Sequence, residues 1–255
     1  MQITSAKNPF YKELTASLKG RGAYSRHIRI DGTASLEELL VTGHQADVIA
    51  VTEEMSVREE FRRLIVHTGP GTRTVILARH LFEKVSVTRT PAGIMAWVRW
   101  PWQEFDSSVE QLNKVLLLDR VQDPGNVGTL IRSAAAFGLD AVVLTAGSAL
   151  PWGEKTVRAS MGSVFRIPVY LLSEEHRLED WQDRPGLIAA DAGGNDLRQF
   201  SWPERWILTI GNEGQGISAD YAAAAEHTVS IFMKGGTESL NAAVAGSIML
   251  FEASR

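Results

Sequence analysis

Hydrophobic positions in the second half of the chain follow two periods, one typical of buried strands and one of amphipathic helices. Val115–Leu118 and Ala141–Leu144 are apolar runs short enough for strands that are buried on both faces. Between them, Val127, Leu130 and Ile131 recur at spacings of three and four and share one helical face. This pattern predicts a β-α-β unit with a ligand-sized loop after its first strand.

The loop and helix of this unit carry its polar residues. Asp123–Gly125 predicts a turn, and Asn126 follows at the position of a helix N-cap, where its side-chain oxygen can accept a backbone N–H. The helix is predicted to end at Phe137, before a glycine. Arg132 lies off the apolar face. It is either a solvated surface residue or a functional one, and the helix alone leaves both open.

The rest of the second half repeats the alternation of strands and helices. Strands are predicted at Ile167–Leu172, Leu187–Asp191, Trp206–Ile210 and Thr228–Phe232, and helices at Glu154–Ser160 and Ser239–Ala253. Glycine-bearing loops are predicted at Asp191–Asn195, Gly211–Gly216 and Met233–Asn241. Interleaved strands and helices indicate an α/β fold with a mostly parallel sheet, whose ligands bind at the carboxyl ends of the strands.

The first hundred residues predict a smaller α/β domain of their own. Its strands are expected at His27–Ile30, Asp47–Val51, Thr74–Leu77 and Ile94–Trp100, and its helices within Ile3–Leu18 and at Ser35–Leu40 (from a Ser cap), Val57–Leu64 and His80–Val85. The polar stretch 101–114 breaks the pattern. We therefore expect an N-terminal domain at 1–104, a linker at 105–113 and a second domain at 114–255.

Composition narrows the class of protein. The 255 residues include no cysteine and six scattered histidines, so disulfides, thiolate metal sites and a cysteine nucleophile are excluded and no metal site is expected. The absence of long apolar runs and of a secretory signal indicates a cytoplasmic protein without a membrane segment. The net charge is −4, yet the first 30 residues hold six basic residues against one acidic. That basic arm is either a surface that contacts phosphates or a solvated helix.

Two of the loops carry candidate chemistry. Gly211–Gly216 fits neither the dinucleotide fingerprint nor a P-loop, so its glycines are expected to let the backbone approach a flat ligand. Glu213 could accept a hydroxyl proton or hold a cation, or it could be a first-turn acid of the next helix. In the third loop Ser239 is the predicted N-cap and Asn241 lies in the first turn. The final helix, rich in Ala, Gly and Ser, should pack closely on its own chain or on a partner.

Taken together, the loops resemble the TrmH (SpoU) branch of the SPOUT methyltransferases. Asn126–Arg132, Ile210–Ile217 and Ser239–Asn241 are similar to the three signatures of that family, in order and at similar separations, and Arg158–Pro168 resembles its connecting segment. Ile3–Pro9 and Thr90–Ile94 resemble the ends of its RNA-binding N-terminal domain. One departure is Asp31-Gly32, where the family more often has Glu before Gly.

The resemblance implies a SPOUT-type parallel sheet with a trefoil knot, and a homodimer with the active site at the subunit interface. It implies methyl transfer from S-adenosylmethionine, which leaves as S-adenosylhomocysteine, to a ribose 2′-hydroxyl in RNA without a metal. The catalytic positions it implies are Asn126, Arg132, Glu213, Ser239 and Asn241. The cofactor-binding positions are Gly211, Gly216, Ile231 and Leu240. From the basic arm, the RNA-binding candidates are Lys7, Asn8, Lys12, Arg21 and Arg26.

The mechanism and the substrate have alternatives. Arg132 matches a residue assigned as general base, but a guanidinium is practically never deprotonated, so we favour stabilisation of the developing alkoxide and of a flanking phosphate. The basic N-terminal domain favours ribosomal RNA by analogy of architecture. The alternatives are a transfer-RNA 2′-O-methyltransferase, a base methyltransferase, a non-catalytic RNA-binding assembly factor and a nucleotide-dependent transferase.

Overall fold

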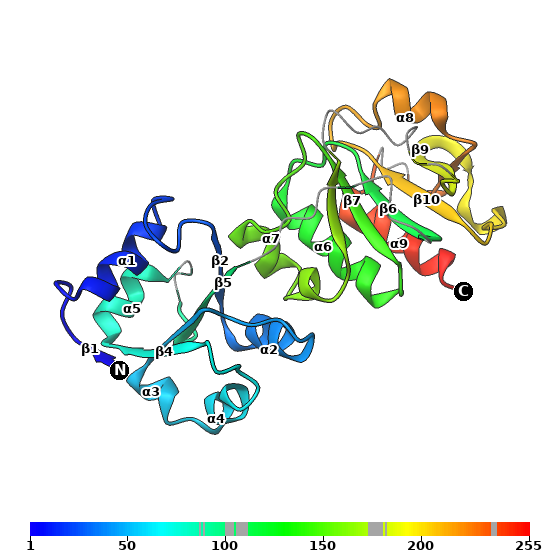
Figure 1. Cartoon of the computed structure of the whole chain (residues 1–255). Helices are drawn as coiled ribbons and strands as arrows, with labels where there is room; N and C mark the ends of the chain where they lie inside the picture. Colours follow the sequence, from blue (N-terminus) through cyan, green and yellow to red (C-terminus); the bar gives the residue numbers. More distant parts are fainter. Residues whose placement is uncertain are drawn as a thin grey trace. The chain divides into compact units, whose positions relative to one another are not determined.

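The chain forms two compact α/β units, Met1–Pro101 and Trp102–Arg255 (Figure 1). The computed structural model describes residues 1–86, 88, 90–99, 105, 112–172, 181, 183–235 and 239–255. Each unit combines one sheet with helices, so the α/β class predicted for both is confirmed. Most of the predicted linker, 105–113, lies outside the described residues, and its bounds stay a prediction.

The N-terminal unit is a five-stranded sheet with strand order β1-β4-β3-β5-β2. Its elements are β1 (Gln2–Ile3), α1 (Pro9–Ser17), β2 (His27–Asp31), α2 (Thr33–Val41), β3 (Val48–Thr52), α3 (Glu53–Ser56), α4 (Glu59–Ile65), β4 (Arg73–Leu77), α5 (Arg79–Val85) and β5 (Ile94–Arg99). β5 runs antiparallel to β2 and β3, and the other pairs are parallel. Figure 1 shows α1 and α5 on one face of the sheet and α2 to α4 on the other.

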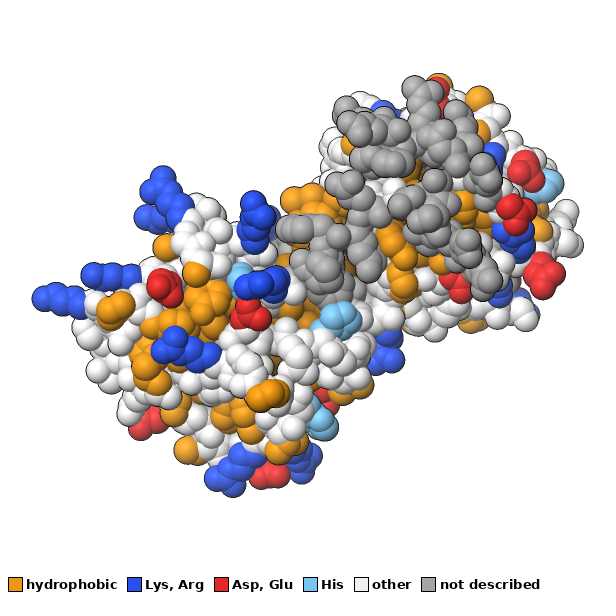
Figure 2. Space-filling view, in the orientation of Figure 1, with side chains coloured by type: hydrophobic (Ala, Val, Ile, Leu, Met, Phe, Trp, Pro, Cys, Tyr) orange, Lys and Arg blue, Asp and Glu red, His pale blue; other side chains and the backbone are white. Residues whose placement is uncertain are grey.

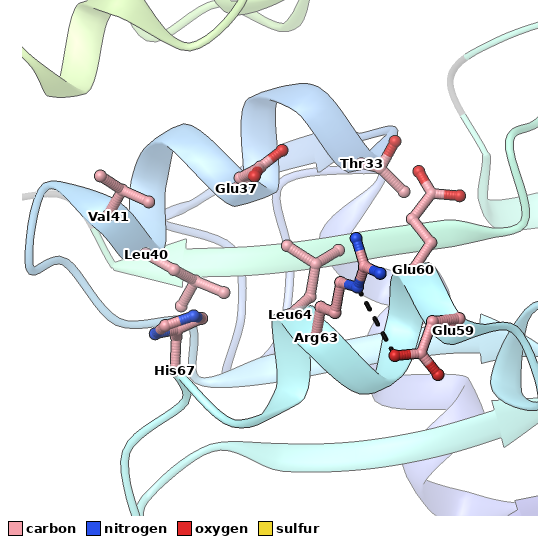
Figure 3. A pocket seen from close by; sticks show the side chains of 9 residues that line it. All are labelled: Thr33, Glu37, Leu40, Val41, Glu59, Glu60, Arg63, Leu64 and His67. Carbon is pink, nitrogen blue, oxygen red and sulfur yellow. Dashed lines mark ion pairs between the residues drawn. The ribbon is translucent and has the colours of Figure 1, made fainter.

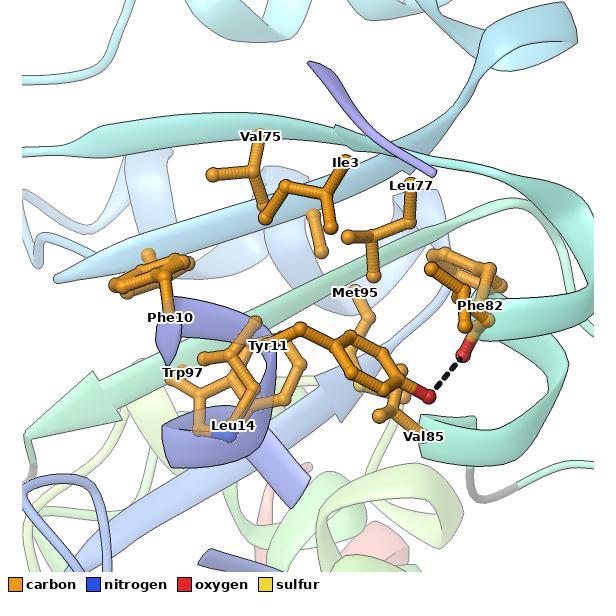
Figure 4. Packing of buried hydrophobic residues seen from close by; sticks show 13 residues of the cluster. Ile3, Phe10, Tyr11, Leu14, Val75, Leu77, Phe82, Val85, Met95 and Trp97 are labelled. Atoms are coloured by element: carbon orange, nitrogen blue, oxygen red, sulfur yellow. Dashed lines mark hydrogen bonds between the residues drawn. The ribbon is translucent and has the colours of Figure 1, made fainter. Parts of the chain in front are cut away.

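Apolar side chains of α1 and α5 pack against the sheet and form the core on this face (Figure 4). Tyr11 and Leu14 on α1 face Leu81 on α5, and all three are buried. Two polar atoms in this core have partners: the Tyr11 hydroxyl donates to the carbonyl of Leu81 (3.1 Å), and Trp97 Nε1 donates to Ser17 Oγ (3.0 Å). Each fully buried large side chain contributes about 1.5–3 kcal/mol, so this cluster holds the two helices on the sheet.

Two details of the helices in this unit differ from the sequence prediction. Ser35 does not cap α2, because the helix begins two residues earlier, after Gly32, whose φ of 103° lets the chain turn out of β2. The helix predicted at Val57–Leu64 is α4, which begins two residues later, and the short helix before it, α3, was not predicted. α3 begins directly after β3, because the Thr52 hydroxyl accepts the backbone N–H of Met55 (3.2 Å) and caps it.

The C-terminal unit is a six-stranded sheet with strand order β11-β9-β10-β6-β7-β8. Its elements are β6 (Lys114–Leu118), α6 (Pro124–Ala136), β7 (Ala141–Thr145), α7 (Glu154–Ala159), η1 (Ser163–Phe165), β8 (Val169–Leu172), β9 (Gly186–Asp196), η3 (Leu197–Gln199), β10 (Trp206–Ile210), α8 (Ala219–Ala224), β11 (His227–Ser230) and α9 (Ala242–Ala253). All of its strand pairs are parallel, as predicted. The knot implied by the resemblance stays a prediction.

One predicted glycine loop belongs to a strand. β9 continues through Asp191–Asn195 to Asp196, whereas the sequence predicted a loop there. Against β11, Thr228 pairs with Ala189 and the next residue, Val229, pairs with Asn195. The residues between Ala189 and Asn195 therefore bulge out of the ladder. Small residues in this stretch permit such a bulge, and the apolar pattern alone could not show that pairing resumes beyond it.

Helix α6 is packed tightly between α7 and α9. A Cβ built on Gly128 would lie 2.5 Å from the carbonyl oxygen of Thr156 and 2.6 Å from Cβ of Ala159, both on α7. A Cβ on Gly246 of α9 would lie 2.5 Å from Cδ2 of Leu130 on α6. The close packing predicted for the final helix is therefore found within its own chain. Across the residues that the structure describes, no helix is both long and apolar enough to cross a membrane.

Gly128→Ala should destabilise the C-terminal unit, because the added methyl group meets backbone atoms of α7 that cannot move aside. We expect the free energy of unfolding to fall by about 1–3 kcal/mol, measured by urea denaturation followed by circular dichroism. Thr129→Ala, at the neighbouring exposed position of α6, is the control and should leave the midpoint nearly unchanged. Equal midpoints for the Gly128 variant and the wild type would contradict the packing described.

Candidate functional site

The loop between β6 and α6 holds Asn126 in a different role from the one predicted. The N-cap of α6 is Asp123, whose Oδ1 accepts the backbone N–H of Asn126 at 2.8 Å, and Pro124 is the first helical residue. Asn126 is thus the third residue of the helix and not its cap. Because Asp123 supplies the cap, the amide of Asn126 is available for other contacts.

That amide connects the three segments that carry the family-like motifs, which contain Asn126, Glu213 and Asn241. Asn126 Nδ2 donates to Glu213 Oε1 at 2.8 Å, and Asn241 Nδ2 donates to Asn126 Oδ1 at 3.0 Å. Only 8% of Asn126 is exposed, so its hydrogen bonds are largely shielded from water. Three of the five predicted catalytic residues are therefore joined in one chain of hydrogen bonds, which we call the Asn126 network.

Asn241 has two roles at the start of α9. It is the N-cap, with Oδ1 accepting the backbone N–H groups of Ala243 (3.0 Å) and Val244 (3.2 Å), while its Nδ2 points to Asn126. The prediction that Ser239 caps this helix was wrong, because the helix begins three residues later. Ser239 is exposed beside the network.

The loop 211–216 is closed by its own backbone. Asn212 and Gly216 exchange two backbone hydrogen bonds (3.0 and 2.9 Å), and Asn212 Oδ1 accepts two more N–H groups within the loop. A Cβ on Gly211 would lie 2.4 Å from the backbone of Gly216, so glycine is required there. Glu213 is at the tip, and α8 begins only at Ala219, so Glu213 is not a first-turn acid of that helix.

Two residues that follow directly after β6 support this loop, and neither was predicted as a site residue: Asp119 and Arg120. Asp119 is only 2% exposed; its Oδ2 accepts the N–H of Ser218 (2.6 Å) and its Oδ1 accepts the Thr145 hydroxyl (3.3 Å). Arg120 has a φ of 55°, a conformation that non-glycine residues seldom adopt, and its carbonyl accepts Asn212 Nδ2 at 2.9 Å. A carboxylate directly after the apolar run 115–118 was the signal that could have found them.

A cavity of about 370 Å³ lies between the ends of β9, β10 and β11 and the start of α9. The predicted site residues that line it are Gly211, Glu213, Gly216, Ile231, Ser239, Leu240 and Asn241. Three further lining residues were not predicted as site residues: Met233, Met249 and Asp191. The cavity thus combines backbone from glycine-bearing loops, apolar side chains and polar groups, which suits a flat ligand with a polar end.

The charged side chains that the structure describes in the lining of this cavity are acidic. Asp191 and Glu213 line it, and among the lining residues that the structure describes there is no Lys, Arg or His. Within the same described part of the chain, no group of His, Cys, Asp and Glu could hold a metal ion. This electrostatic environment favours a ligand with a positive charge and disfavours phosphates.

Arg132 is not part of the Asn126 network within one chain. It is exposed on α6, and its Nη1 lies 3.2 Å from the sulfur of Met161. It does not line the cavity. The structure therefore brings together four predicted catalytic residues (Asn126, Glu213, Ser239 and Asn241) and leaves the fifth at the surface.

Four of the five predicted RNA-binding residues of the N-terminal unit are exposed, and the fifth caps a helix. Lys7, Lys12, Arg21 and Arg26 are exposed, and Figure 2 shows Lys and Arg side chains standing out from this unit. Asn8 caps α1 instead, because its Oδ1 accepts the N–H groups of Phe10 (2.9 Å) and Tyr11 (3.2 Å). Its side chain is therefore used for folding.

A second cavity, of about 340 Å³, lies between α2 and α4 (Figure 3). Its apolar lining includes Leu40 and Leu64, and Arg63 at its edge forms an ion pair with Glu59 (Nε to Oε1, 3.5 Å). It contains none of the residues predicted from the sequence. Nothing in its lining favours one ligand over another.

Comparison with known proteins agrees with the geometry. A family described as the SpoU rRNA Methylase family matches residues 113–251. The 23S rRNA (guanosine(2553)-2′-O)-methyltransferase RlmP of Bacillus subtilis is 32% identical over 98% of both chains, and the 23S rRNA (uridine(2479)-2′-O)-methyltransferase of Streptomyces viridochromogenes is 33% identical over 86% of this chain and 83% of its own. The crystal structure of the SpoU methyltransferase AviRb from S. viridochromogenes in complex with AdoMet has a TM-score of 0.83, with 26% identity and 97% of both chains covered.

Asn126→Asp should make stability depend on pH in a new way. The substitution places a second carboxylate where the amide now donates to Glu213, and neighbouring carboxylates raise the pKa of the pair. A carboxyl pair with a raised folded-state pKa is stable when it holds a proton and loses that stability as pH rises. Relative to the wild type, we expect about 1–2 kcal/mol more destabilisation at pH 8 than at pH 5, measured by urea unfolding.

The double variant Asn126→Asp/Glu213→Gln is the control, since a glutamine can donate to the new carboxylate. Its difference from the wild type should not change with pH. A pH-dependent loss that persists in the double variant would contradict the contact between Asn126 and Glu213.

Proposed function

We propose that this chain, which belongs to the SpoU rRNA Methylase family, transfers a methyl group from S-adenosylmethionine to a ribose 2′-hydroxyl of ribosomal RNA. The observation that carries the proposal is the Asn126 network, which brings Glu213 and Asn241 to the edge of a cavity lined by the expected cofactor-binding positions. Fold, network and relatives all favour the same reaction.

The cavity fits the cofactor in size and in charge. S-adenosylmethionine supplies a methyl carbon on a positively charged sulfur, which leaves as a neutral thioether. The backbone at Gly211, Ile231 and Leu240 would hold it, and the carboxylates of Asp191 and Glu213 favour its positive charge. The same carboxylates disfavour the phosphates of a nucleotide-dependent transferase, which was one of the alternatives.

In the proposed reaction a new bond forms between the ribose 2′-oxygen and the methyl carbon, and the hydroxyl proton must leave. Asn126 orients the carboxylate of Glu213, which can accept this proton, directly or through a phosphate oxygen of the RNA. Arg132 keeps its positive charge and stabilises the developing alkoxide and the flanking phosphate. The remaining rate enhancement comes from binding the cofactor and the RNA so that the ribose oxygen, the methyl carbon and the sulfur are aligned.

Arg132 does not line the cavity of its own chain, and a second chain could bring it to the site. α9 exposes Val244, Ile248 and Phe251, which recur at spacings of four and three and form one apolar face. This face adjoins α6, where Ser133, the neighbour of Arg132, hydrogen-bonds Ser247 of α9 at 2.7 Å. We propose a two-fold homodimer formed by α6 and α9, in which each Arg132 serves the partner's cavity.

Ribosomal RNA is the favoured substrate, because the two curated relatives above are named as 23S rRNA enzymes and the N-terminal unit exposes basic residues. Transfer RNA as substrate, and a non-catalytic assembly factor that keeps the fold, are the alternatives. The cytoplasmic location expected from the sequence stays a prediction.

The function is tested with purified protein, tritiated S-adenosylmethionine and ribosomal RNA that lacks the modification. The expected result is label in a 2′-O-methylated nucleoside after digestion. Label in a methylated base would contradict ribose methylation, label only with transfer RNA would overturn the substrate, and cofactor binding without transfer would favour the assembly factor.

Subunits that carry different defects should complement each other if Arg132 acts across the dimer. In a heterodimer of an Arg132→Ala chain and a Glu213→Gln chain, one site has both substitutions and the other has neither. The heterodimer, isolated with two different affinity tags, should therefore have about half the wild-type activity, while each homodimer is nearly inactive.

If Arg132 served the cavity of its own chain, both sites of the heterodimer would be defective and its activity would stay as low as that of the homodimers. Size-exclusion chromatography with light scattering on each sample shows whether the dimer itself is intact. A heterodimer that is intact and inactive would overturn the proposed arrangement.

A further inference from the structure

The bulge in β9 brings a second carboxylate to the cavity. Between Ala189, which pairs with β11, and Asn195, where pairing resumes, the strand leaves the ladder. Gly194 at the end of the bulge presses against β11, because a Cβ there would lie 2.6 Å from the backbone nitrogen of Val229. This close contact holds the bulge outward and places Asp191 in the cavity lining.

Asp191 is held within the bulge by a hydrogen bond to the backbone. Its Oδ1 accepts the backbone N–H of Gly193 at 2.9 Å. Among the residues that the structure describes, no Lys, Arg or His forms an ion pair with it. Glu213, the other carboxylate of the lining, accepts a hydrogen bond from Asn126. Asp191 is therefore an uncompensated negative charge beside a cavity that contains no described basic residue.

We propose that Asp191 determines the preference of this cavity for the cationic methyl donor over the neutral product. The inference rests on the proposed function and goes beyond it, since the reaction itself needs no such preference. At neutral pH S-adenosylmethionine carries one net positive charge, and S-adenosylhomocysteine carries none. The two differ by a single methyl group, so shape distinguishes them poorly and charge distinguishes them well.

The consequence for turnover is a weaker hold on the product than on the donor. When the methyl group leaves, the sulfur loses its charge and the attraction to Asp191 disappears. A cavity selective by shape alone would bind the product about as tightly as the donor, and the product would then strongly inhibit the enzyme. Asp191 thus acts as a specificity-determining residue for the ligand that enters.

The experiment compares three ligands on Asp191→Asn and on the wild-type protein by isothermal titration calorimetry. Asparagine keeps the oxygen that accepts the N–H of Gly193 and removes only the charge. The ligands are S-adenosylmethionine, S-adenosylhomocysteine and sinefungin, which carries an ammonium group near the position of the sulfonium. We expect the ratio of the two dissociation constants, product to donor, to fall about three- to tenfold, with sinefungin weakened like the donor and the product unchanged.

Asp220→Asn, an exposed carboxylate on α8 that does not line the cavity, is the matched control and should leave all three affinities unchanged. An unchanged ratio in Asp191→Asn, or an equal loss for all three ligands, would overturn the role of Asp191 while the proposed function stands. If the wild-type protein binds none of the ligands, the proposed function fails and the inference fails with it.

Discussion

The buried amide of Asn126 is the interaction on which the rest of the site depends. An amide can donate and accept at once, and here it donates to Glu213 in one loop and accepts from Asn241 at the start of α9. Neither a carboxylate nor a hydrocarbon of similar size could do both. Asp123 makes this possible, because it caps α6 in place of Asn126. One short turn after β6 therefore determines how three separate loops meet.

Residue types and their order predicted much of this. The apolar runs located the strands of the parallel sheet, and the three loop motifs contained four residues that the structure places together. The assignment of helix starts was less successful: Asn126, Ser239 and Ser35 were each taken as caps, and each helix begins elsewhere. Several polar residues in a loop can cap a helix, and the choice among them depends on tertiary contacts that no local pattern contains.

Other features could not be predicted because they arise between distant segments. The bulge of β9 exists only because β11 pairs again beyond it, so Asp191 could not be assigned to the cavity from its neighbours in sequence. The exposure of Arg132 has the same origin. A helix pattern shows that a side chain lies off the apolar face, and it does not show whether the neighbouring surface belongs to the same chain or to another.

The Asn126 network also affects when the site is completed during synthesis and folding of the chain. Asn126 and Asn241 are 115 residues apart, and β6, the strand before Asn126, pairs with β10, which follows β7, β8 and β9 in the chain. Contacts of such separation require a long loop of chain to close, which slows folding. A nascent chain that has already emerged through α6 therefore carries its first signature without a completed site. The cavity proposed for the methyl donor is complete only when the segment around residue 241 has joined the fold. A chain that is interrupted before that point therefore has no partly active site.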